Sequence, residues 1–72
     1  MARTLDVRGL RCPIPLVRAR AVLPELGPDE ALDVLATDPE APIDIGALAA
    51  DEGLDLAVAE EDGVFRMTLR RR

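Results

Sequence analysis

The sequence predicts a two-layer α/β sandwich of βαβαββ order, with two helices on one face of a mixed four-stranded sheet. Stretches of alternating apolar residues predict the strands, and two amphipathic stretches between them predict the helices. An Asp62-Gly63 pair indicates a tight hairpin before the last strand. Two short helices can cover only one face of a sheet, hence the two layers. At 72 residues, the chain is expected to form one domain, 1–72.

The first three elements occupy the N-terminal half. Residues 4–8 alternate, with Leu5 and Val7 on one face, and predict a strand that Gly9 ends. Residues 13–23 predict a helix with one broad apolar side, and Pro13 suits its first position. Pro24 should end or kink this helix near Leu23. Residues 31–37 predict the second strand.

The second half continues the pattern. A helix is expected over residues 41–52, and Gly53 is a natural stop for it. Residues 54–58 and 65–69 alternate and predict two strands that form the closing hairpin. The two strand–helix–strand crossovers imply right-handed connections between parallel neighbours, and the hairpin adds an antiparallel strand.

The composition excludes several classes of chemistry. The chain has one cysteine, Cys12, and neither histidine nor lysine. An intramolecular disulfide, a Cys–His pair, a metal site and Schiff-base catalysis are therefore not expected, and no cofactor is expected. A free thiol suits a reducing cytosol. Neither a signal-peptide h-region nor an apolar run of the roughly 20 residues that span a bilayer is present. We therefore expect a cytoplasmic protein with no membrane partner.

Charge is distributed unevenly along the chain. The net charge is −5, but residues 1–20 total +4, residues 21–65 total −13 and residues 66–72 total +4. The arginines at 70–72 are read as a solvated tail. No aromatic residue lies among the arginines to stack on bases, so no direct nucleic-acid binding is expected.

Cys12 is the candidate reactive residue. It follows the first predicted strand and immediately precedes the first predicted helix, where the N-terminal partial charge favours a thiolate. Arg8, Arg11 and Arg18 would act in the same direction. Such placements lower the pKa of cysteine from about 8.5 to roughly 3.5–7.5. The alternative is a small buried hydrophobic residue without chemical function.

Three further residues have two interpretations each. Gly9 is consistent with close approach of a partner or with a simple tight turn. Asp38 and Asp44 lie after the second strand, at the same sheet edge as Cys12 if the first two strands are parallel. Because a nearby carboxylate would oppose ionisation of the thiol, we expect both to serve as capping or first-turn residues of the second helix, with partner contact as the open alternative.

The segment Leu5-Asp6-Val7-Arg8-Gly9-Leu10-Arg11-Cys12-Pro13-Ile14-Pro15 resembles the signature of the TusA/SirA-like sulfur-carrier family, including its Cys-Pro-x-Pro helix start. The similarity continues through residues 36–39 and 44–45, and length and element order fit the whole chain. The resemblance implies a βαβαββ sandwich with a mixed four-stranded sheet. It departs at residues 46–50, where many relatives carry an aromatic residue and sometimes a second cysteine, and at Pro24.

The resemblance also implies a function. Cys12 would carry a persulfide, received from a desulfurase or rhodanese type of donor protein and passed to an acceptor protein in tRNA thiolation, cofactor assembly or sulfur oxidation. The chain would be a sulfurtransferase in the sense of a relay. Residues expected to contact substrate or partners are Arg8, Gly9, Arg11, Pro13 and Arg18. The alternatives are a non-catalytic binding or regulatory module of the same fold and a thiol-redox protein.

Overall fold

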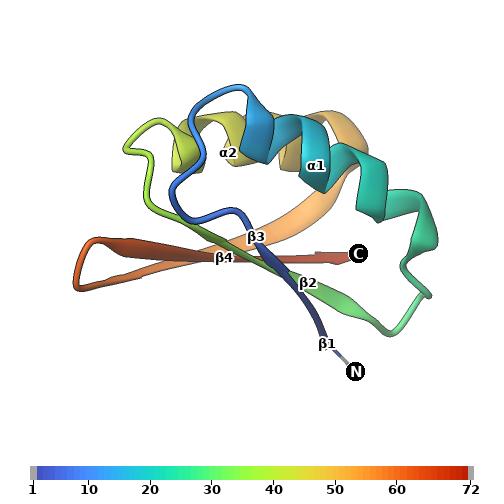
Figure 1. Cartoon of the computed structure of the whole chain (residues 1–72). Coiled ribbons are helices and arrows are strands. Elements are labelled where there is room, and N and C mark those ends of the chain that lie inside the picture. The colour runs from blue at the N-terminus through green and yellow to red at the C-terminus, as the bar shows by residue number, and fades with distance from the viewer. Residues whose placement is uncertain (1, 72) are drawn as a thin grey trace.

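The computed structural model describes residues 2–71 as two helices packed on one face of a four-stranded sheet (Figure 1). The predicted α/β sandwich of βαβαββ order is confirmed. The elements in chain order are β1 (Ala2–Asp6), α1 (Ile14–Val22), a 3-10 turn (Leu23–Glu25), β2 (Ala31–Ala36), α2 (Ala41–Glu52), β3 (Leu54–Glu61) and β4 (Val64–Arg71).

The strand order β1-β2-β4-β3 corrects one expectation about the sheet. The first crossover joins parallel neighbours, β1 and β2. The second does not, because β4 lies between β2 and β3 and is antiparallel to both. Met67 of β4 therefore faces Val34 on one side and Val58 on the other. This central position buries the inner face of β4 between two apolar strands.

The core lies between the helices and the sheet. The inner face of β2 is fully buried, as are Met67 and Leu69 of β4, whereas Phe65 at the start of β4 is partly buried. Of the two helices, α2 contributes the larger buried side chains. In α1 the buried positions are Pro15 and Ala19, so this helix can lie close to the sheet. The largest fully buried side chains are Leu32, Ile45, Leu48, Met67, Leu69, Val7, Val34 and Pro15.

Element ends follow local chemistry in most places. Pro24 ends α1, because a proline lacks the N–H that continuation of the helix needs, and the chain leaves through the 3-10 turn. The Arg71 guanidinium donates to the Leu23 carbonyl oxygen at 2.9 Å. Gly53 ends α2 in the left-handed conformation at φ +66°. Arg72, the last residue of the predicted basic tail, lies outside the described residues.

β1 begins two residues earlier than predicted. Ala2 and Arg3 pair with Ala31 and Leu32, so the ladder starts where β2 starts. Over the described range of 2–71, no helix is both long and apolar enough to cross a membrane.

Candidate functional site

Two loops meet at the edge of the sheet where the parallel strands β1 and β2 end, as expected. Gly9 donates its N–H to the Thr37 hydroxyl at 2.9 Å, and Cys12 donates its N–H to an Asp38 carboxylate oxygen at 2.7 Å. Gly9 has φ +81°, a conformation that glycine adopts without strain. The other Asp38 oxygen accepts the Glu40 N–H at 2.9 Å. Asp38 therefore ties the Cys12 loop to the start of α2.

The Cys12 thiol lies against the first turn of α2. Its Sγ donates to Asp44 Oδ2 at 2.6 Å, and the residue is half-buried. It is therefore neither enclosed among the leucines of the core nor fully solvated. The contact joins residues 32 positions apart, which meet because β1 and β2 end at the same edge of the sheet and α1 and α2 pack on the same face.

The electrostatics of the thiol contradict the expected direction. The hydrogen bond to Asp44 is the main reason that the pKa of Cys12 rises from 9.0 to about 11, and desolvation and the charges of Asp44, Glu40 and Asp38 add to it. A carboxylate that accepts the thiol proton favours the thiol, because ionisation would place two negative charges side by side. The expectation of a lowered pKa was wrong for this arrangement, in which Cys12 keeps its proton.

The first turn of α1 explains why the partial positive charge of the helix N-terminus does not offset the rise in the pKa of Cys12. Pro13 and Pro15 carry no N–H. The N–H of Ile14 donates to the Arg11 carbonyl at 2.9 Å, and that of Val17 donates to the Pro13 carbonyl at 3.0 Å. Most of the donors that would stabilise an anion at a helix N-terminus are thus missing or already paired.

The predicted arginines are not gathered at the sulfur. The Arg8 guanidinium donates to both Asp6 oxygens, at 2.9 and 2.7 Å. Arg11 is exposed beside the cysteine, and its charge helps to lower the pKa of Asp38 after the two backbone hydrogen bonds to that carboxylate. Arg18 is exposed on α1.

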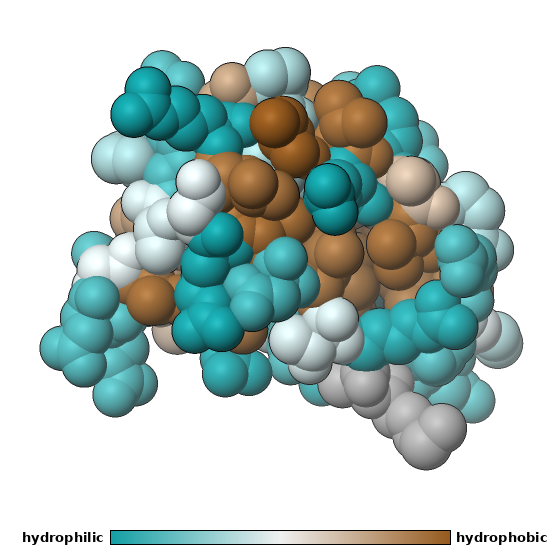
Figure 2. Space-filling view, viewed as in Figure 1, coloured by the Kyte–Doolittle hydropathy of each residue, from teal (hydrophilic) through white to brown (hydrophobic). Residues whose placement is uncertain are grey.

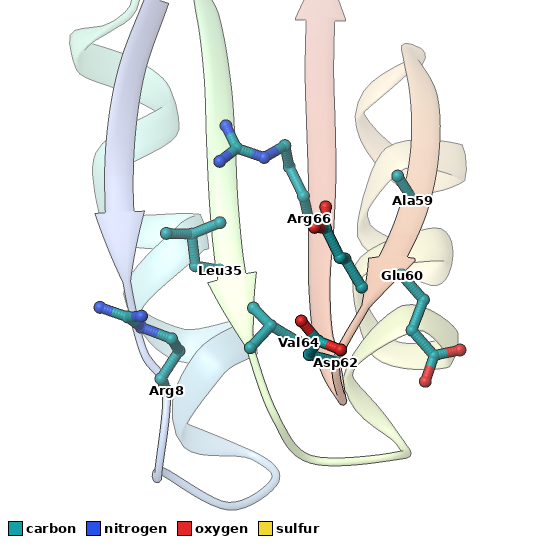
Figure 3. A pocket seen from close by; sticks show the side chains of 8 residues that line it. Arg8, Leu35, Ala59, Glu60, Asp62, Val64 and Arg66 are labelled. Atoms are coloured by element: carbon teal, nitrogen blue, oxygen red, sulfur yellow. The ribbon is translucent and has the colours of Figure 1, made fainter.

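Arg8 also lines a hollow of about 320 Å³ with Leu35, Ala59, Glu60, Glu61, Asp62, Val64 and Arg66. Figure 3 shows the strands in front and the helices behind, so this hollow opens on the face of the sheet that the helices leave uncovered. Cys12, in contrast, lies against α2 on the covered side. The structure therefore separates Arg8 from the thiol and places Arg11 and Pro13 beside it.

Exposed apolar side chains lie close to Cys12 or to Asp44 in the sequence. Ile14 and Val17 on α1 are 43% and 60% exposed, and Ile43, next to Asp44 on α2, is 72% exposed. Pro13 is also exposed. Figure 2, viewed as in Figure 1 with α1 in front, shows hydrophobic surface across the middle of the molecule, framed by hydrophilic residues. Large exposed apolar side chains gathered near a reactive group are typical of protein contact surfaces.

Asp44 is the residue whose role sequence reasoning missed. The pattern placed it in the first turn of α2 at the correct edge of the sheet, and that position is confirmed. Its carboxylate, however, contacts the thiol. Asp38, for which a capping role or a partner contact was expected, accepts the N–H groups of Cys12 and of Glu40 at the start of α2. Within residues 2–71, no group of three or more Cys, Asp or Glu side chains is arranged to hold a metal ion.

Comparisons with known proteins point to one family. A family model described as sulfurtransferase TusA matches residues 3–71. The chain is 39% identical over 59 residues to the sulfur carrier protein TusA of Allochromatium vinosum, covering 82% of this chain and 78% of that one. It is 40% identical over 72 residues to a Neisseria meningitidis serogroup A protein provisionally named a sulfur carrier, covering 99% and 97% of the two chains. The crystal structure of a SirA-like protein from Desulfitobacterium hafniense superposes with a TM-score of 0.86 at 32% identity, covering 96% and 95%.

Proposed function

The chain belongs to the TusA family of sulfur carriers, and from that premise we propose that it relays sulfur as a persulfide on Cys12. The donor is a protein of the desulfurase or rhodanese type, and the acceptor is a second protein. Acceptors that serve tRNA thiolation, cofactor assembly or sulfur oxidation all fit this role. A reducing cytoplasm suits the free thiol.

The observation that carries the proposal is the position of a solitary thiol. Cys12 is the one cysteine of the chain, and it is half-buried at the rim of an exposed apolar surface. A second thiol nearby would attack the persulfide and release the sulfur. A carrier without one can hold the sulfur until an acceptor docks.

The transfer is an exchange at sulfur. The Cys12 sulfur attacks the outer sulfur of the donor persulfide, and a new S–S bond forms on Cys12 while the donor S–S bond breaks. The inner sulfur, which belongs to the donor's own cysteine, leaves with the bonding electrons and takes up the proton that Cys12 loses. Attack by an acceptor thiolate on the outer sulfur of the loaded carrier repeats the step, with no net oxidation.

Residues near the thiol are proposed to contact the partners. Pro13 and Arg11 flank Cys12 and are exposed. Arg18 extends this surface along α1. Arg8 lines the hollow on the uncovered face of the sheet, so it would contact only a partner that also reaches that face. For Gly9, its positive φ and its hydrogen bond to Thr37 support a turn role over close approach.

Intact mass after incubation with a cysteine desulfurase and cysteine tests the proposal. We expect a gain of one sulfur atom that is lost on reduction and absent from Cys12→Ser. Because serine replaces sulfur by oxygen at nearly the same size, this variant is the matched control. Absence of the gain with desulfurase and rhodanese donors alike would contradict the carrier function.

The alternative is a non-catalytic binding module with the same fold. The contact of the thiol with Asp44, which raises the pKa of Cys12, is the observation that favours it. A binding module would leave Cys12 unmodified with every donor, and Cys12→Ser would bind its partner as well as the wild type does.

A further inference from the structure

The contact between Cys12 and Asp44 is built from both sides. Asp44 sits in the first turn of α2, and the adjacent Ile45 is fully buried and anchors that turn. The Cys12 backbone is held by Asp38 at 2.7 Å, so the 2.6 Å contact between Sγ and Oδ2 joins two fixed elements.

The charged groups around the thiol are mostly negative. The loop between β2 and α2 contributes Asp38 and Glu40, and α2 contributes Asp44, all of which act on Cys12. Among the ion pairs formed within residues 2–71, none includes any of these three carboxylates.

The arginines do not balance this group. Of the three that are near Cys12 in sequence, Arg8 is paired with Asp6 and Arg11 acts on Asp38. Arg18 lies further along α1. The rim of the thiol therefore offers unpaired negative charge to a docking partner, beside the apolar side chains of Ile14, Val17 and Ile43.

We propose that Asp44 controls the ionisation of Cys12: in the free carrier its carboxylate holds the thiol proton, and a cationic side chain of the docked sulfur-transfer partner neutralises Asp44 and releases the thiolate. This inference rests on the proposed carrier function and makes Asp44 a positioning residue. The free carrier is thereby protected from reaction with small oxidants and electrophiles, since the thiolate is the nucleophile. When a donor docks, the proton leaves Cys12 and ends on the departing donor sulfur, so charge and atoms balance.

Direct titration of the free protein tests the first part of the proposal, that Asp44 holds the proton on the Cys12 thiol. The chain has no tyrosine or tryptophan and one cysteine, so the ultraviolet absorbance of the thiolate reports Cys12 without interference from other residues. We expect Asp44→Asn to move the midpoint from about 11 toward the ordinary 9.0 by at least one pH unit. Asp51→Asn removes the same charge from an exposed position two turns along α2 and should leave the midpoint in place.

Alkylation rates give a second readout. At about pH 8, a fall of one unit in the titration midpoint of Cys12 raises the thiolate fraction roughly tenfold but lowers the intrinsic nucleophilicity of the thiolate roughly threefold. Iodoacetamide should therefore react about three times faster with Asp44→Asn than with the wild type. Both measurements are made without a sulfur donor. Failure of the carrier function and failure of this inference are therefore distinguishable.

Disulfides of different charge test the second part of the proposal, that a cationic group near Asp44 favours reaction of Cys12, and they do so on the wild-type protein. Cystamine carries cationic arms, and hydroxyethyl disulfide is its neutral counterpart. Relative to a small reference thiol, Cys12 should prefer cystamine by roughly fivefold, the factor expected for one unit-charge pair a few ångströms apart in water. The preference should fall in high salt and in Asp44→Asn, and persist in Asp51→Asn.

The outcomes decide the matter even if Asp44→Asn fails to fold, because the wild-type measurements stand alone. A wild-type midpoint at or below 9.0, or equal rates with the two disulfides, would overturn the inference. So would equal shifts in Asp44→Asn and Asp51→Asn, because general charge and not the contact would then be responsible.

Discussion

Replacing Gly9 by alanine is expected to destabilise the protein through backbone strain alone. Gly9 has φ +81°, and a Cβ built there meets no atom within 4 Å. The change therefore adds no clash and removes no side chain. Holding an L-residue in the left-handed region costs about 1–2 kcal/mol. We expect the free energy of unfolding to fall by that amount.

The same substitution at Gly46 should have the opposite effect and serves as the control. Gly46 lies within α2, and an added Cβ would lie 3.9 Å from a Leu56 methyl carbon, an ordinary van der Waals contact. Alanine is more favourable than glycine in a helix interior by about 0.8–1.0 kcal/mol. Gly46→Ala should therefore stabilise the fold, and the two variants should differ by about 2–3 kcal/mol.

Urea denaturation followed by far-ultraviolet circular dichroism measures both changes. The chain lacks tryptophan and tyrosine, so intrinsic fluorescence is a poor probe. With an m-value near 1 kcal/mol/M, the midpoint should fall by about 1–2 M in Gly9→Ala and rise by about 1 M in Gly46→Ala. Gly9→Asn should recover part of the loss, because asparagine tolerates this conformation.

An unchanged midpoint in Gly9→Ala would refute the reasoning from backbone strain. If that variant also loaded sulfur more slowly than the wild type, the close approach of a partner at Gly9 would be the better explanation for the glycine. Equal effects of the two substitutions would show that they act through something other than φ.

Three further predictions concern the core, the acid dependence and the loop. Leu32→Ala should lower the free energy of unfolding by about 2–5 kcal/mol, because Leu32 is fully buried in a central strand; a wild-type urea midpoint would contradict this. The side-chain hydrogen bond from Arg8 lowers the pKa of Asp6 from 3.8 to about 2. Their pair therefore stabilises the fold above pH 3.8 and loses its effect as the pH falls through about 2, so Arg8→Gln should flatten the fall of the urea midpoint over that range. Asp38→Ala frees the Cys12 N–H, whose hydrogen exchange should become faster than in the wild type; unchanged exchange would mean that Asp38 does not hold the loop.

Much of the secondary structure could be predicted because it depends on neighbours in sequence. The bounds of α2 follow from apolar spacing and from Gly53, and the hairpin follows from Asp62-Gly63. Pro24 ends α1 through its own missing N–H. Each of these signals acts within a few residues, so it can be read without knowledge of the rest of the chain.

Strand order could not be predicted in the same way. Alternation indicates which face of a strand is apolar but not which strands lie beside it. β4 lies between β2 and β3, where Met67 and Leu69 on its inner face have an apolar strand on each side and are more completely buried than they would be at the edge of the sheet. The start of β1 was likewise decided by its ladder with Ala31 and Leu32.

The cysteine shows the same division most sharply. Its place between the first strand and the first helix, its lack of a second thiol and its Cys-Pro-x-Pro motif are properties of the sequence alone. The largest influence that raises the pKa of its thiol is Asp44, which is 32 residues away in the chain and 2.6 Å away in space. An ionisation equilibrium responds to charges within a few ångströms, and only the packed structure determines which charges those are.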